Sequence, residues 1–383
     1  MKTIILSIFL ILICSQFTGC KEDTIAPILV DESPQVSVNV YIDPIPFKWD
    51  SKYILAYELH IVNNKMDTLA ITQIKVLPNN EAAPYFPPFE GDVLAEMMSM
   101  ATPPNYATGQ TIFFWLEFEG REEIPTQIMH QITYIDPVNN ENIIIESEVL
   151  NVANSEAIQI SSPVKGNNWL ALNGPSNKDH HHRRFAIDIN GTPYMGQRHA
   201  VDWLRIGENG LIFKNRADPG NLQNDDFHCY GDTLYAVADG YIIDSRDGMP
   251  ENPVGSLIPG ITLENAGGNF IILCLNETAY AFYAHLIPGS LLVQTGDYVY
   301  EGQAIGLLGN SGNSDLPHLH FHLATGNSFF YAQGIPYEIK SFSKSGALED
   351  AFEWFDSFQP WQPQGQSENV TSELPVLNTI LNF

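Results

Sequence analysis

The chain is poor in positive charge. Its 383 residues hold 18 Lys and Arg against 45 Asp and Glu, which gives a formal net charge of −27. A surface this acidic repels the phosphates of nucleic acids and anionic lipid headgroups, so charge attraction to either is excluded. The hydrophobic fraction of 44% and the charged fraction of 16% are those of a globular protein, and the length predicts two domains.

Sequence signatures of several enzyme classes are missing. The chain has no Gly-x-Ser-x-Gly element, no Walker phosphate loop and no Cys-His signature of a thiol hydrolase. Covalent hydrolysis and phosphoryl transfer therefore have no support, and we expect no organic cofactor. Cysteine is scarce: beyond the N-terminal twenty residues only Cys229 and Cys274 remain, and their spacing fits no metal motif. Whether they form a disulfide is left open.

The first twenty residues are typical of an export signal. Lys2 is followed by an apolar run from residue 4 to residue 13, which is too short to span a membrane. Residues 17–20, Phe-Thr-Gly-Cys, resemble a bacterial lipobox, which implies that Cys20 carries a lipid; ordinary signal cleavage is the alternative. Residues 21–23, Lys-Glu-Asp, resemble a surface-export signal of lipoproteins. The resemblance predicts an exported protein, lipid-anchored in the cell envelope at the outer membrane, facing either the periplasm or the surface.

Short alternating apolar segments recur between residues 36 and 160, separated by turns rich in Asn, Pro and Gly. About seven such segments predict an immunoglobulin-like β-sandwich over residues 35–165, after a tether at 21–34. His60 and His130 stand alone there and are predicted to be structural. Residues 166–340 again show short strands punctuated by glycine, without a long amphipathic helix, and predict a second all-β domain. Residues 341–383 form a polar and aromatic tail.

Residues 317–323, Pro-His-Leu-His-Phe-His-Leu, alternate with a period of two. In a β-strand His318, His320 and His322 would share one face, and the intervening apolar residues would enter the core. Neutral imidazole is the commonest protein ligand of transition metals, so this face predicts a metal site with a second histidine at the substrate. The alternative is the polar outer face of an edge strand. His322 itself is predicted to face solvent rather than to support a ligand.

Three consecutive histidines, at positions 180 to 182, precede a strong hairpin signal at Asn190-Gly191. A hairpin there would lay the histidine end of its first strand beside residues 198–202, so one of these histidines is expected to meet Asp202. The register is open by one residue. Arg183 and Arg184 are expected either to bind a substrate carboxylate or to end in solvent.

Five ordered motifs within about residues 180–325 resemble the M23 family of zinc metallopeptidases, the lysostaphin and LytM type that cuts peptide bonds in bacterial cell walls. They are residues 234–240, 282–286, 296–306, 309–314 and 317–321. The resemblance implies an antiparallel β peptidase domain with one zinc ion. The metal would be bound by a His, an Asp and the second His of His-Leu-His, with two further histidines in catalysis.

Carried over by position, the resemblance implies that His320 is a zinc ligand and that His318 and His285 are catalytic. The first motif departs from the family, because no His stands four residues before either candidate aspartate, Asp188 or Asp202.

Residues 197–203 resemble a subgroup in which a His-Arg-Arg element precedes the aspartate by a hairpin. This favours Asp202 over Asp188 and makes His182 the first ligand, with His180, His181 and His199 as alternatives.

Such a site leaves the fourth tetrahedral position of zinc for water, whose pKa the metal lowers towards about 7. His318 and His285 would then take the water proton, stabilise the oxyanion and protonate the leaving amine. The predicted function is therefore zinc-dependent endopeptidase cleavage of stem or cross-bridge peptides of peptidoglycan. One alternative is an inactive M23-like envelope lipoprotein that binds or regulates partners; another is a surface adhesin that acts through its sandwich. The bond cut, the substrate-binding residues and the oligomeric state are left open.

Overall fold

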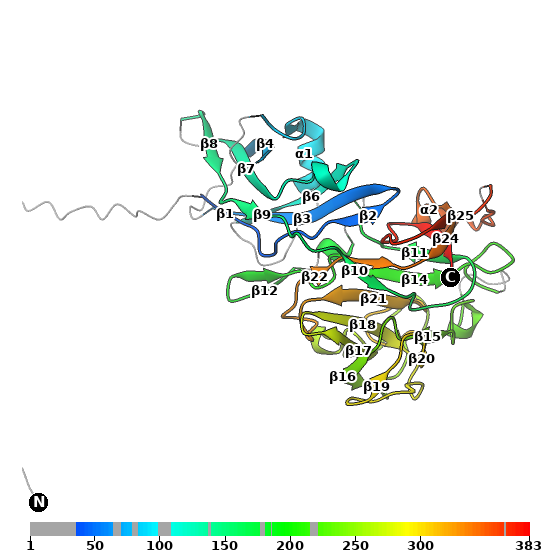
Figure 1. The fold of residues 1–383 in the computed structure, drawn as a ribbon. Coiled ribbons are helices and arrows are strands. Elements are labelled where there is room, and N and C mark those ends of the chain that lie inside the picture. The colour runs from blue at the N-terminus through cyan, green and yellow to red at the C-terminus, as the bar shows by residue number, and fades with distance from the viewer. Residues whose placement is uncertain are drawn as a thin grey trace, which may run out of the picture. The chain divides into compact units, whose positions relative to one another are not determined.

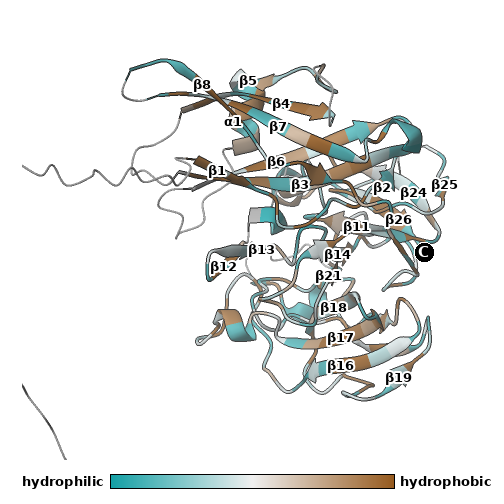
Figure 2. Cartoon of the chain, turned by 60° about the vertical axis from the view of Figure 1, so that its left-hand side comes forward, coloured by the Kyte–Doolittle hydropathy of each residue, from teal (hydrophilic) through white to brown (hydrophobic). Residues whose placement is uncertain are grey.

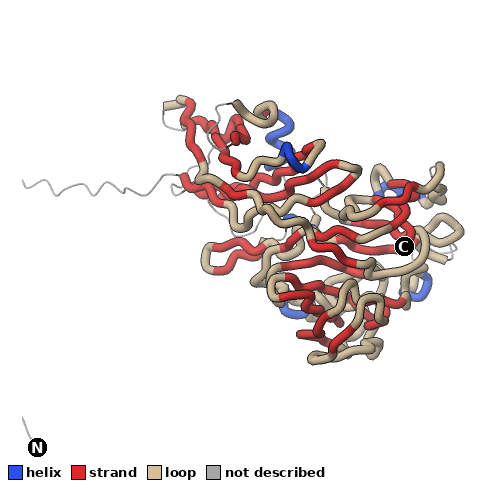
Figure 3. Tube along the Cα trace, viewed as in Figure 1, coloured by secondary structure: helices blue, strands red, loops and turns tan. Residues whose placement is uncertain are grey.

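The computed structural model describes residues 36–63, 70–78, 83–98, 109–136, 139–176, 181–184, 186–214, 221–363 and 365–383. The export signal, the tether, Cys20 and His180 lie outside these residues. Residues 35–383 form one compact unit. Strands dominate the described chain, which confirms the all-β prediction, and its two α-helices are short (Figure 3). No helix in the described ranges is long and apolar enough to cross a bilayer.

The N-terminal strands form two antiparallel sheets (Figure 1). The first contains β1 (Val36–Asn39), β2 (Phe47–Trp49), β3 (Lys52–Asn63) and β6 (Gly109–Phe118). The second contains β4 (Ala70–Pro78), β5 (Phe89–Glu90), β7 (Gln127–Ile135), β8 (Asn142–Glu146) and β9 (Leu150–Asn151). The helix α1 (Gly91–Met98) follows β5.

A single apolar core joins these two sheets, with Tyr57 and Phe114 from the first and Ile128 and Ile132 from the second. Burial alternates residue by residue along β7, because successive side chains of a strand point to opposite faces. The chain changes sheet between β3 and β4, between β5 and β6, and again between β6 and β7. This order supports the immunoglobulin-like assignment, which stays a prediction.

The second region is built on an eleven-stranded sheet. Its strands run in the order β19 (Tyr298–Val299), β16 (Gly240–Arg246), β17 (Asn269–Asn276), β18 (Ala279–Leu286), β21 (Leu319–Ala324), β14 (Val201–Arg205), β11 (Trp169–Leu172), β26 (Thr379–Asn382), β24 (Phe342–Ala347) and β25 (Glu368–Val370), with β22 (Gly334–Ile335) also paired to β21. The hydrophobic residues concentrate in the strands (Figure 2). The C-terminal tail supplies three strands of this sheet, and α2 (Ala351–Ser357) lies between two of them.

Three further strand pairs complete the described fold. They are β10 (Ile158–Ile160) with β23 (Tyr337–Ile339), β12 (Ile187–Ile189) with β13 (Thr192–Tyr194), and β15 (Thr233–Tyr235) with β20 (Ala304–Leu307). The β12–β13 hairpin turns at Asn190-Gly191, as predicted, with both residues at positive φ. Each of its strands has only three residues, however, and turns at Arg198 and Ala200 interrupt the chain before β14. The prediction that this hairpin carries a histidine to Asp202 is therefore wrong.

Candidate metal and catalytic site

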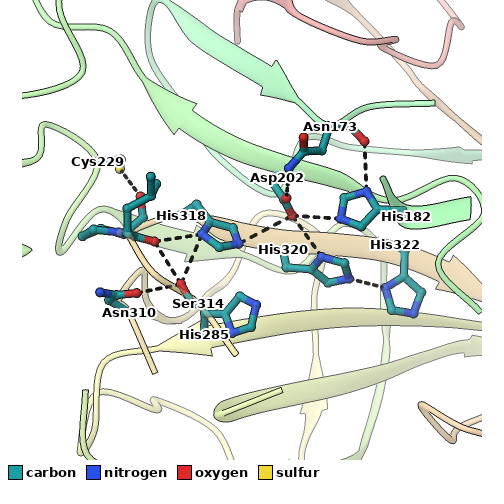
Figure 4. A network of polar contacts seen from close by, with 12 residues as sticks. Asn173, His182, Asp202, Cys229, His285, Asn310, Ser314, His318, His320 and His322 are labelled. Carbon is teal, nitrogen blue, oxygen red and sulfur yellow. Dashed lines mark hydrogen bonds and ion pairs between the residues drawn. The ribbon is translucent and has the colours of Figure 1, made fainter. Parts of the chain in front are cut away.

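Asp202 owes its position to strand pairing. In the antiparallel register of β14 with β21, Asp202 lies directly opposite His320, and the Nδ1 atom of His320 is 3.0 Å from Asp202 Oδ1. His182 reaches the same oxygen from a single 3₁₀ turn, η2 (His182–Arg184), with its Nε2 atom at 3.3 Å. The Nε2 atom of His318 lies 3.6 Å from it. Three imidazoles thus converge on one carboxylate oxygen (Figure 4).

The remaining polar atoms of these groups have partners of their own. Asn173, just after β11, donates from Nδ2 to Asp202 Oδ2 at 2.7 Å, and its carbonyl accepts from Nδ1 of His182 at 2.9 Å. The Nε2 atom of His320 is 3.0 Å from Nδ1 of His322. A neutral histidine that donates through one ring nitrogen keeps a lone pair on the other. In their neutral forms, Nε2 of His182 would therefore present a lone pair towards Asp202, and so would Nδ1 of His320 when its Nε2 donates.

These groups are enclosed: Asp202, His182 and His320 are each 5% exposed. Burial lowers the pKa of His320 from 6.5 to about 4 and holds the pKa of His285 well below its usual value. For Asp202, burial favours the protonated acid, but the adjacent His182 and His318 outweigh it and keep the pKa of its carboxyl well below the ordinary range. Asp202 is consequently ionised at neutral pH, and His320 is neutral.

The arrangement fits a divalent cation. His182 Nε2, His320 Nδ1 and Asp202 Oδ1 converge, and a divalent cation among them would take the place of the protons that His182 and His320 otherwise offer to the carboxylate. Two His nitrogens and one carboxylate oxygen are a ligand set of catalytic zinc sites. Among the described residues, His181, His182 and Asp202 form a group whose ligand atoms all lie within 4.8 Å of one another, so the exposed His181 is a second candidate from the same segment.

The other first-ligand candidates fall elsewhere. His180 lies outside the described residues, and the buried ring of His199 packs edge-on against Phe47 of β2, with ring centroids 5.4 Å apart. Asp188, the rejected aspartate, lies in the β12–β13 hairpin and accepts from the amide of Gly191.

His285 and His318 lie beside this cluster with ring centroids 4.8 Å apart. Nδ1 of His285 donates to the carbonyl of Ser311 at 2.7 Å, and Nδ1 of His318 donates to that of Leu316 at 2.9 Å. Each ring thereby keeps Nε2 as its proton acceptor. His285 also adopts a left-handed backbone conformation, with φ of 72°, which costs a non-glycine residue about 1–3 kcal/mol.

Two expectations for neighbouring residues are wrong. His322 is 1% exposed rather than solvated, because its ring stacks on Phe282 of β18 at a centroid distance of 4.5 Å. Arg183 neither binds substrate nor ends in solvent: it is 1% exposed and bound to Glu58. The side chain of Arg184 lies outside the described part of the chain.

Residues outside the site behave as structural groups. His130 lies 2.9 Å from the hydroxyl of Tyr57, and His60 lies 3.2 Å from that of Thr111, so both are paired core histidines. Cys229 and Cys274 are free thiols. Sequence reasoning missed Asn173 and Glu58. For Glu58 a signal exists, since it is a lone acid within an apolar stretch of β3.

Part of the chain is similar to known proteins. Residues 225–330 match the model of peptidase family M23, a segment that includes His285, His318 and His320 but neither His182 nor Asp202. Endolysin 2638A of Staphylococcus phage 2638A is 36% identical over 103 residues, which are 26% of this chain and 20% of the endolysin. The chain therefore spans about a fifth of the length of this curated relative.

Solved structures show more distant likeness. The catalytic domain of lysostaphin from Staphylococcus simulans is 25% identical, with 44% of this chain and 88% of that chain covered and a TM-score of 0.24. A zinc containing peptidase from Vibrio cholerae is 13% identical, with 75% and 81% covered and a TM-score of 0.22.

Proposed function

Because residues 225–330 form a peptidase family M23 domain, we propose that this protein is a zinc-dependent endopeptidase that hydrolyses the stem or cross-bridge peptides of peptidoglycan. The observation that carries the proposal is the convergence of His182 and His320 on Asp202, with a second pair, His285 and His318, beside them. Two groups of histidines, one suited to a metal and one to proton transfer, are what metal-assisted hydrolysis requires.

His182, Asp202 and His320 would hold the metal. Bound zinc supplies a Lewis acid that polarises the scissile carbonyl and lowers the pKa of water. His318 and His285 would move the protons through Nε2: the ring that takes a proton from the attacking water carries that proton and delivers it to the leaving amine, while the other ring donates no proton until it has accepted one. Burial lowers the pKa of His285, so its ring enters the reaction neutral and ready to accept. No side chain has to form a covalent bond to the substrate.

The hydrogen bonds behind the catalytic pair give it a fixed orientation. Ser314 donates from Oγ to Asn310 Oδ1 at 2.6 Å and lies 3.3 Å from Nδ1 of His318. A ring held from behind keeps its reactive nitrogen in one place, which reduces the entropy lost on reaching the transition state.

The choice of peptidoglycan rests on the M23 match and on the relative, which is an endolysin. Lipid attachment at Cys20, also proposed, would hold the protein in the cell envelope, where that substrate lies.

The test is digestion of purified sacculi by the zinc-loaded full chain, with new amino groups counted and released fragments identified by mass spectrometry. We expect new peptide amines from wild type and none from His320→Ala. Full activity in His320→Ala, or intact sacculi after treatment with zinc-loaded wild type, would reject the proposal.

A further inference from the structure

A buried carboxylate of the N-terminal sandwich binds two arginines that flank the metal-site residues. Glu58, on β3, is 2% exposed. Its Oε1 atom accepts from Nε of Arg183 at 2.8 Å, and its Oε2 atom accepts from Nε of Arg198 at 2.6 Å. Arg183 follows His182 directly, and Arg198 stands four residues before Asp202. One carboxylate is thus tied to both segments that bring ligands to the site.

Each arginine is also fixed at its far end. Nη2 of Arg183 donates to the carbonyls of Tyr57 and Phe114 at 2.9 and 3.2 Å, so this side chain is held by β3 and β6. Arg198 donates from Nη1 to the carbonyl of Gly334 at 2.7 Å, which ties it to β22. Glu58 therefore connects the segment of Arg183, which is held by the sandwich, to the segment of Arg198, which is held by the peptidase sheet.

His182 needs such an anchor. Asp202 and His320 are placed by the β14–β21 ladder, whereas His182 lies in a single 3₁₀ turn between β11 and β12. His182 lines a small recess together with Asn173, His181, Arg183 and Arg198, so the arginine cluster and the ligand segment adjoin in space. A one-turn segment has few backbone hydrogen bonds of its own and takes its position from its side chains.

We propose that Glu58 is a positioning residue of the metal site, which holds His182 against Asp202 by binding Arg183 and Arg198 together. The inference rests on the proposed function, because it takes His182 as a zinc ligand. It also makes the N-terminal sandwich part of the active site rather than an independent module.

Charge explains why the carboxylate matters. The two guanidinium groups share one buried anion, and without it they would repel each other at short range in a medium of low dielectric. Their separation would pull the His182 turn away from the segment that leads to β14. Supporting groups behind metal ligands typically alter metal affinity by about 10- to 100-fold.

The experiment compares zinc affinity in the full chain for wild type, Glu58→Gln, Arg183→Lys and Glu338→Gln. Glu338 is a matched control: it is 2% exposed, and it likewise accepts from the sandwich, through the amide of Lys48 at 2.9 Å, but it contacts neither arginine in the described structure. Arg183→Lys keeps the positive charge but loses the planar guanidinium group that binds Glu58. It therefore tests the same contact if Glu58→Gln fails to fold. Circular dichroism and urea unfolding establish which variants are folded.

Zinc affinity is measured by competition with a chromophoric chelator, and cobalt(II) absorption in the visible range reports the coordination geometry. We expect zinc binding about 10- to 100-fold weaker in Glu58→Gln and Arg183→Lys, with an altered cobalt spectrum, and wild-type behaviour in Glu338→Gln. Wild-type affinity and spectrum in the folded variants would overturn this inference and leave the proposed function standing. A wild-type chain that binds no zinc would overturn both.

Discussion

Two buried carboxylates of this molecule have different partners. Asp202 faces imidazoles of His182, His318 and His320, whereas Glu58 faces the guanidinium groups of two arginines. Both are almost fully enclosed, at 5% and 2% exposure. Arginine keeps its charge at every accessible pH, whereas histidine gives up its proton near neutrality.

This difference in partners distinguishes the Asp202 cluster, which can take up a metal ion, from the Glu58 cluster, whose counterions are two arginine side chains. In the Asp202 cluster, burial lowers the pKa of His320 to about 4, so this ring is neutral at neutral pH and can bind a metal ion without first losing a proton. The Glu58 cluster carries permanent counterions: burial favours the neutral acid, but Arg198 and Arg183 outweigh it and lower the pKa of Glu58 to about 2. The Asp202 cluster is therefore suited to binding a ligand, and the Glu58 cluster to holding segments of the fold together.

The largest expected effect comes from exchanging each acid for its amide. Asp202→Asn should lose both zinc and sacculus hydrolysis to background, because it removes a ligand charge. Glu58→Gln should retain measurable hydrolysis at saturating zinc, because its ligands survive. The two variants are compared by amine release from sacculi at high and low zinc concentrations. Equal losses of hydrolytic activity in both variants at saturating zinc would contradict the different roles assigned to Asp202 and Glu58.

Removing either proton-transfer histidine should give the next largest effect. His285→Ala and His318→Ala are expected to lower kcat by about 10²- to 10⁴-fold, the usual contribution of general acid–base catalysis. Zinc content should stay at the wild-type value, because neither ring is needed to bind the metal. Loss of zinc in either variant would show that the residue is a ligand instead.

A smaller effect is expected at His322. His322→Phe preserves the stacking on Phe282 but removes the nitrogen that faces His320 Nε2. Zinc affinity should fall by about 10- to 100-fold, while kcat at saturating zinc changes little. Chelator competition measures the first quantity and steady-state hydrolysis the second. Unchanged affinity would mean that this contact does not orient the ligand.

The smallest effect is a pH dependence of apoprotein stability. Burial lowers the pKa of His320 and of His60 to about 4, so between pH 6.5 and 4 the unfolded chain binds protons that the folded chain does not, and stability falls as pH falls. From pH 7 to pH 5.5 each such histidine should cost about 1 kcal/mol.

Glu58 adds no slope in that interval. Its lowered pKa stabilises the fold fully above pH 4.5, and this contribution is lost only as pH falls towards about 2. Urea unfolding of the apoprotein at several pH values gives the slope, which should be shallower in His320→Gln than in wild type. Identical slopes in the two proteins would contradict the assignment of this proton uptake to His320.

Much of the catalytic region was predictable because its information is local. The alternation of residues 317–323 shows which side chains share a face, and the structure places His318 and His320 together beside Asp202. The prediction that Asp202 and His182 meet agrees with the structure, but for the wrong reason: the β14–β21 ladder positions Asp202, and the hairpin is too short to do so.

What could not be predicted depends on segments distant in the sequence. Arg183 lies 125 residues from Glu58, and nothing near either residue reveals the partner. The burial of His322 likewise follows from Phe282 on the neighbouring strand, because a period of two identifies a face without showing what covers it. Asn173 enters the site only because β11 pairs with β14.

The most direct test of the metal site is the zinc content per chain of the purified full-length protein, for wild type, His182→Ala and His181→Ala. We predict about one zinc in wild type and in His181→Ala, and none in His182→Ala, because two imidazoles and one carboxylate are the minimum of a catalytic site. Absence of zinc from wild type after reconstitution, or its retention in His182→Ala, would contradict the account.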